Sequence, residues 1–177
     1  MKRAWVVLAL VILLLAVTGC SKIQVDLPDR EVPVSEEAAQ SLQQKISQLD
    51  WQSGTATLTV TESEVTSYIN LKLLDEEVPI KEPTVWFEDG KVYIAGKLDK
   101  NALPVGGQAA LIVDLSVQDG KLHIQVEKAV VGGVPVPSGV LDKLTDTLNE
   151  HLSAKFGPIT VKELHIGQGT ATISLAR

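Results

Sequence analysis

The chain has 177 residues, of which 45% are apolar, and it carries a net charge of −6. This acidic balance opposes binding to nucleic acid and charge-driven attachment to anionic lipids, and an aromatic content of 4% makes stacking platforms for bases or sugars scarce. The single cysteine excludes an internal disulfide, so the fold must depend on the burial of apolar side chains.

The first 20 residues have the order of an export signal. Lys2 and Arg3 precede an uncharged apolar run over residues 4–17, which as a helix would extend roughly 21 Å, short of the ~30 Å hydrocarbon core of a bilayer. Val17-Thr18-Gly19-Cys20 resembles the lipobox of bacterial lipoproteins, which implies cleavage before Cys20 and attachment of diacylglycerol to its sulfur. An uncleaved anchor helix is the alternative.

Three segments follow from this interpretation: a signal peptide over residues 1–19, a lipidated cysteine with a flexible tether over residues 20–34, and one globular domain over residues 35–177. Pro28 and Pro33 stand among charged residues in the tether, a composition typical of a spacer. Cleavage leaves 158 residues with 14 basic and 22 acidic side chains, a length that suits a single domain. We expect this domain on the extracytoplasmic face of the cell membrane, or at the outer membrane of an organism that has one.

The domain begins with a helix, a strand and a second helix. Ser35 can cap a first helix whose apolar positions share one face and which ends near Asp50. A strict alternation of threonine and apolar residues from Gly54 to Thr61 predicts a strand with one wet face. Thr61-Glu62-Ser63-Glu64 fits a capping box, so a second helix starts there and carries an apolar stripe to Leu73.

Two hairpins and a helix follow. Asp89-Gly90 separates strand-like runs over 84–88 and 91–98, and Asp119-Gly120 separates runs over 109–118 and 121–131. The prolines of the 132–137 loop lack an N–H and argue against a continued sheet, and Ser138 can cap a leucine-rich helix. The chain closes with two strands, over 159–166 and 170–176.

These elements are each apolar on one side, so their apolar sides must meet. The simplest solution is an α+β fold in which a curved antiparallel sheet of about seven strands wraps around amphipathic helices. A sheet that curls completely encloses an ordinary core, whereas one that curls incompletely leaves a long apolar groove for a lipid chain. The sequence leaves both open.

The order of the Thr61–Val65 helix start, two Asp-Gly hairpins, the Gly132–Pro137 loop and a leucine-rich helix resembles the small envelope proteins of the tubular lipid-binding (TULIP) superfamily, including YpmS-like and YceB-like groups. The resemblance covers roughly residues 35–177. It implies a TULIP-like sheet rolled around a long helix, an apolar cavity, and a role in lipid binding or transport.

We therefore expect a membrane-tethered protein that binds an apolar ligand such as a lipid acyl chain between sheet and helix, with the 132–137 loop at the mouth. The hypothetical lining comprises Leu111, Val113, Leu115, Leu122, Ile124 and Val126 from the sheet and Leu144, Leu148 and Leu152 from the last helix. The alternative is an envelope protein–protein interaction module that has a filled core and binds its partner through an exposed strand edge.

Catalytic and metal motifs are weak. Three histidines, at positions 123, 151 and 165, are widely separated, and zinc sites normally need three or four protein ligands. Asp142, Asp146 and Glu150 lie opposite the leucine stripe, where a solvated face belongs. Pro137-Ser138-Gly139 is not a nucleophile elbow. We expect neither an enzyme nor a cofactor.

Overall fold

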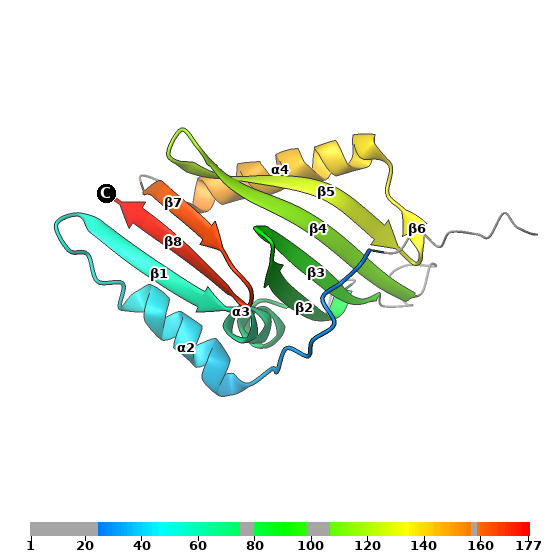
Figure 1. The fold of residues 1–177 in the computed structure, drawn as a ribbon, viewed down its shortest axis with the longest axis horizontal. Coiled ribbons are helices and arrows are strands. Elements are labelled where there is room, and N and C mark those ends of the chain that lie inside the picture. Colours follow the sequence, from blue (N-terminus) through cyan, green and yellow to red (C-terminus); the bar gives the residue numbers. More distant parts are fainter. Residues whose placement is uncertain (1–24, 75–79, 99–106, 157–158) are drawn as a thin grey trace, which may run out of the picture.

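The computed structural model describes residues 25–74, 80–98, 107–156 and 159–177. The predicted signal peptide and Cys20 therefore lie outside the described residues. Figure 1 shows the arrangement of the helices and strands. In chain order these elements are α2 (Glu36–Ser47), β1 (Thr55–Thr61), α3 (Glu62–Tyr68), the π-helical turn η1 (Ile69–Leu73), β2 (Ile80–Glu88), β3 (Lys91–Leu98), β4 (Gly107–Gln118), β5 (Lys121–Val131), β6 (Val134–Pro135), α4 (Ser138–Phe156), β7 (Thr160–Ile166) and β8 (Thr170–Ala176).

The strands form two antiparallel sheets. One has the order β1-β8-β7 and the other has the order β2-β3-β4-β5-β6. This confirms the α+β class, although the strands divide between two sheets where one was expected. The division has a physical cause, because α3 and η1 intervene between β1 and β2, and β1 instead pairs with β8 from the end of the chain.

The turn chemistry read from the sequence is confirmed. Asp89 and Asp119 both have φ of 51°, followed by Gly90 and Gly120 at 78° and 71°, as two-residue hairpin turns require. The expectation that the 132–137 loop takes no part in a sheet is wrong, because β6 pairs with the end of β5. A proline is tolerated there because β6 is an edge strand of two residues.

Helix α3 and turn η1 close one edge of the five-stranded sheet. Polar side chains one helical turn apart bond to alternate residues of β2. The pairs are Glu62 with the Phe87 N–H at 2.5 Å, Thr66 with the Val85 N–H at 3.0 Å, and Asn70 with the Pro83 carbonyl at 2.6 Å. The spacing matches because four helical residues rise ~6 Å and two strand residues ~6.6 Å.

Helix α4 closes the opposite edge in the same way. Thr145 Oγ1 accepts the Val126 N–H at 3.0 Å, and one turn later the Asn149 side chain accepts the Ile124 N–H and donates to the Ile124 carbonyl, both at 2.8 Å. Helix α4 consequently lies along β5 at the margin of the sheet (Figure 1). At these positions the backbone of β5 is occupied, which disfavours partner binding through this edge.

Residues 25–34, which we call the strap, are packed against the domain. The interpretation of this stretch as a flexible spacer is therefore wrong for residues 25–34, because Val25 is buried and the Arg30 side chain reaches two carboxylates on the domain. The strap crosses the five-stranded sheet before it enters α2 (Figure 1). The folded unit thus includes residues 25–34 as well as the domain expected from Ser35 onward.

Two apolar clusters form the interior. The first joins both sheets through buried side chains such as Val85, Phe87 and Ile166. The second joins β5 to α4 through Val126, Ala129 and Leu141. Leu111 and Ile124 pack against both clusters, so the interior is continuous from the three-stranded sheet to α4.

Candidate functional site: the seam between helix α4 and the sheet

The structure brings most of the predicted lining together. We call the contact surface of these nine residues the seam. Seven of them pack into the two apolar clusters: Leu111, Val113, Leu115, Ile124, Val126, Leu144 and Leu148. The other two, Leu122 and Leu152, are partly buried and belong to neither cluster. Of the three α4 leucines in the predicted lining, Leu144 and Leu148 thus pack against the cluster that joins α4 to β5, and Leu152 does not.

The seam is not sealed from solvent along its length. Val113 and Val126 are buried, at 6% and 2% exposure, whereas the six leucines and Ile124 keep part of their surface accessible. Apolar side chains that point to a shared interior and remain partly exposed are a typical lining for an apolar ligand. The same contacts also describe core packing, the alternative that the sequence left open.

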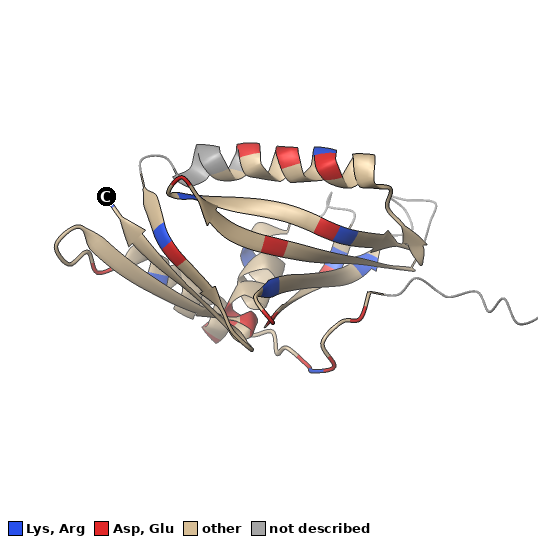
Figure 2. Ribbon diagram, turned by 45° about the horizontal axis from the view of Figure 1, so that its top comes forward, with Lys and Arg blue, Asp and Glu red and all other residues tan. Residues whose placement is uncertain are grey.

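The opposite side of α4 is polar. Asp142, Asp146 and Glu150 are exposed, which confirms the predicted solvated face. Figure 2 shows acidic residues along the outward side of this helix. Within the parts of the chain that are described, no three histidine, cysteine or acidic side chains gather in a geometry that holds a metal ion. The charges of α4 therefore keep one face of the helix in water while the leucine stripe meets the sheet.

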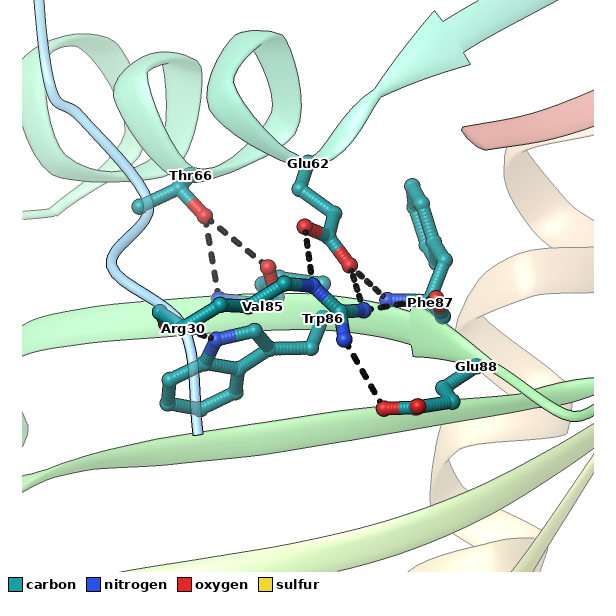
Figure 3. Close-up of polar contacts among 7 residues, drawn as sticks. All are labelled: Arg30, Glu62, Thr66, Val85, Trp86, Phe87 and Glu88. Carbon is teal, nitrogen blue, oxygen red and sulfur yellow. Dashed lines mark hydrogen bonds and ion pairs between the residues drawn. The ribbon is translucent and has the colours of Figure 1, made fainter. Parts of the chain in front are cut away.

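One arginine, Arg30, fastens the strap to α3 and β2, at the edge of the five-stranded sheet opposite α4. Arg30 binds the Glu62 carboxylate through Nη2 at 2.6 Å and Nε at 3.2 Å, and its Nη1 binds Glu88 at 2.9 Å (Figure 3). Arg30 Nη2 also donates to the Phe87 carbonyl, and Trp86 Nε1 donates to the Arg30 carbonyl, both at 2.9 Å. The hydrogen bond to Glu62, together with the Glu88 carboxylate, raises the pKa of Arg30 despite its partial burial.

The contact of Arg30 with Glu62 and Glu88 was not predicted from the sequence, because these residues lie far apart along the chain. Glu62 was recognised only as part of a helix start. Two signals were present: an arginine among acidic residues before the first helix, and two glutamates, Glu62 and Glu64, within the capping box. The other glutamate, Glu64, is also buried; burial opposes its ionisation, but hydrogen bonds from Lys45, Ser41 and the Thr61 N–H outweigh it and lower its pKa.

An apolar hollow lies beneath the strap. This outer groove has a volume of ≈ 550 Å³, within the ~300–1,000 Å³ range of small-molecule sites. Its apolar lining comes from the strap, the π-helical turn and strands β2 and β3: Leu27, Val34, Leu71, Pro83, Trp86 and Ala95. No sequence signal marked this surface, because the strap was not expected to cover the sheet.

These observations define a small α+β domain with an apolar groove beneath the strap and a partly exposed apolar seam beside α4. Comparison with protein families places the chain in a family of that kind: it matches the LmeA-like phospholipid-binding family over residues 15–175 and belongs to that family. This membership supports a lipid-binding domain and a lipid as its partner, in agreement with the resemblance read from the sequence. Comparisons with curated proteins and with solved structures returned no match.

Proposed function

We propose that this protein is an extracytoplasmic lipoprotein, anchored through Cys20, that binds a phospholipid by holding an acyl chain in the seam and catalyses no reaction. The observation that carries the proposal is the partial exposure of five seam side chains that also pack into the apolar clusters: Leu111, Leu115, Ile124, Leu144 and Leu148. Membership of the LmeA-like phospholipid-binding family supports the class of ligand. Over the described residues, no helix has both the length and the apolar character needed to cross a bilayer.

The energetics are sufficient for such binding. Burial of a chain of about 15 methylenes yields at most ~12 kcal/mol at ~0.8 kcal/mol per methylene. Association costs at least ~4 kcal/mol, so nearly complete burial leaves about 8 kcal/mol, which corresponds to micromolar affinity. An acyl chain that lay only half in the seam would bind weakly, and the ligand would exchange readily with a membrane.

Lipid binding is tested on residues 21–177, expressed without Cys20. Native mass spectrometry and solvent extraction should find co-purified phospholipid, and the stripped protein should take up phospholipid that is added back. A protein that is free of lipid and takes none up contradicts the proposal and favours the interaction module with a filled core.

The position of the acyl chain is tested with three variants. Leu148→Trp fills the seam from a partly exposed position and should abolish uptake, whereas Thr147→Trp adds the same bulk to the exposed side of α4 and should not. Ala95→Trp fills the outer groove. If Ala95→Trp loses phospholipid uptake and Leu148→Trp keeps it, the acyl chain binds in the outer groove and the proposed position in the seam is wrong.

Anchoring through Cys20 has a separate test. Cells fed labelled palmitate should incorporate the label into the wild-type protein and not into Cys20→Ser. The wild type should fractionate with membranes, and processing of the precursor should fail in the variant. Equal labelling of both proteins contradicts the anchor.

A further inference from the structure

An exposed apolar tip stands at the start of α4. We define the tip as residues 132–140, which contain Val134 and Val140 at 61% and 53% exposure. No charged residue occurs anywhere from Ala129 to Leu141. In an acidic chain, an uncharged run of this length with two exposed valines is a surface that water solvates poorly.

The backbone of the tip suits an apolar environment. The N–H groups of Gly132, Val136 and Val140 are hydrogen-bonded within the protein, at 2.9 Å each. Pro135 and Pro137 have no N–H at all. At these five of the nine tip positions the backbone donor is satisfied or absent, which lowers the cost of leaving water for a membrane interface.

The tip lies beside the point where the strap begins. Leu27 of the strap and Gln108 of β4 line the same groove, and the Gln108 carbonyl accepts the Gly132 N–H at 2.9 Å. Figures 1 and 2 both show the start of the strap and β6 toward the same end of the long axis, while the far end of α2 lies toward the other.

The short segment between Cys20 and the strap limits how far the domain can lie from the membrane. Val25 is the fifth residue after Cys20, and five steps of at most ~3.6 Å each span about 18 Å. Because Val25 is buried and Arg30 is fastened to Glu62, the strap itself adds no free length. A lipid on Cys20 therefore holds this end of the domain close to the bilayer.

We propose that the tip docks into the interfacial layer of the bilayer that carries the Cys20 anchor. This inference rests on the proposed lipidation and adds an orientation to it. Val136 within the tip and Leu141 immediately after it pack in the apolar cluster between α4 and β5, which connects the tip to the seam. Docking places the end of the seam at the membrane surface, so a phospholipid chain passes between bilayer and protein with little exposure to water.

The test uses the full-length lipoprotein reconstituted in phosphatidylcholine vesicles, whose zero net charge removes repulsion of the acidic domain. The Cys20 sulfur is blocked by diacylglycerol, so an introduced cysteine is the single site for an NBD label. The labelled positions are Val134→Cys and Val140→Cys, with Ile46→Cys on α2 as the control of matched exposure, 53%. Flotation of the vesicles first establishes that each protein is anchored.

At positions 134 and 140, NBD emission should shift to the blue and be quenched by lipids that carry a spin label near the headgroup. At position 46 the emission should remain that of NBD in water. If the protein is anchored but NBD at positions 134 and 140 emits as it does at position 46, the docking proposal is wrong and the anchor is unaffected. Protein that does not float with the vesicles overturns the anchor and the docking together. In Val134→Asp/Val140→Cys, the docking equilibrium constant obtained from quenching at position 140 should fall about tenfold, equivalent to about 1.4 kcal/mol.

Discussion

Arg30→Ala is the most informative change to the fold. It removes both bonds to Glu62, the bond to Glu88 and the bond to the Phe87 carbonyl. The Glu62 side chain is 9% exposed, so it loses its charge partner in a place where water reaches it poorly. The Phe87 N–H remains as a hydrogen-bond donor to that carboxylate.

The loss can be bounded from the structure. Breaking a fully buried ion pair by removing one partner costs ~3–5 kcal/mol. Arg30 is 27% exposed, and screening by solvent reduces that figure, so we expect a loss of about 2–3 kcal/mol in the free energy of unfolding. Arg30→Lys keeps the charge but not the two-pronged geometry, and we expect it to recover less than half of the loss.

Urea unfolding of residues 21–177, followed by circular dichroism, measures the change. At a slope of ~2 kcal/mol/M, the midpoint for Arg30→Ala should fall by about 1–1.5 M. Lys97→Ala is the control, because its pair with Glu82 is 65% and 70% exposed and such pairs contribute ~0–1 kcal/mol. If Arg30→Ala and Lys97→Ala have the same midpoint, the reasoning that the strap is fastened by a shielded ion pair is refuted.

Three further predictions concern the sheet edge, a close approach and pH. Thr145→Val keeps the shape of the side chain but leaves the buried Val126 N–H of β5 without a partner, so it should lower the free energy of unfolding by ~1–3 kcal/mol in the same urea assay. The control, Thr147→Val on the exposed side of α4, should lower it by less than ~1 kcal/mol. Gly96→Ala places a Cβ 2.5 Å from Ile80 Cγ2 and 3.2 Å from a backbone oxygen, so it should lower the thermal midpoint, and an unchanged midpoint would show that β2 gives way easily. Because the pKa of Glu64 is lowered in the folded state, its ionised form stabilises the fold above the unfolded pKa of ~4.3, and this effect is lost as the pH falls through the folded pKa. Glu64→Gln should therefore have a lower free energy of unfolding than the wild type at pH 7. The difference between the two proteins should narrow at pH 3.

The sequence determined the local elements of this protein. Each hairpin turn was readable because Asp-Gly adopts positive φ at little cost, and the Thr61–Glu64 capping box forms both of its hydrogen bonds. The one-sided apolar pattern of β4, β5 and α4 also predicted which side chains meet, since seven of the nine proposed residues pack into the interior clusters. These features depend on residues close together in the chain or on a fixed periodicity.

Only the tertiary structure decided how those elements are joined. The division into two sheets depends on β1 pairing with β8, more than a hundred residues away, and no local signal specifies that partner. The strap was interpreted as a spacer because its composition is polar, but Arg30 finds a buried carboxylate that local composition cannot reveal. The sequence analysis also did not predict that polar side chains of α3 and α4, such as Thr66 and Thr145, bond to the edge strands. Their spacing along the helix matches the spacing of alternate strand residues only once helix and strand lie side by side.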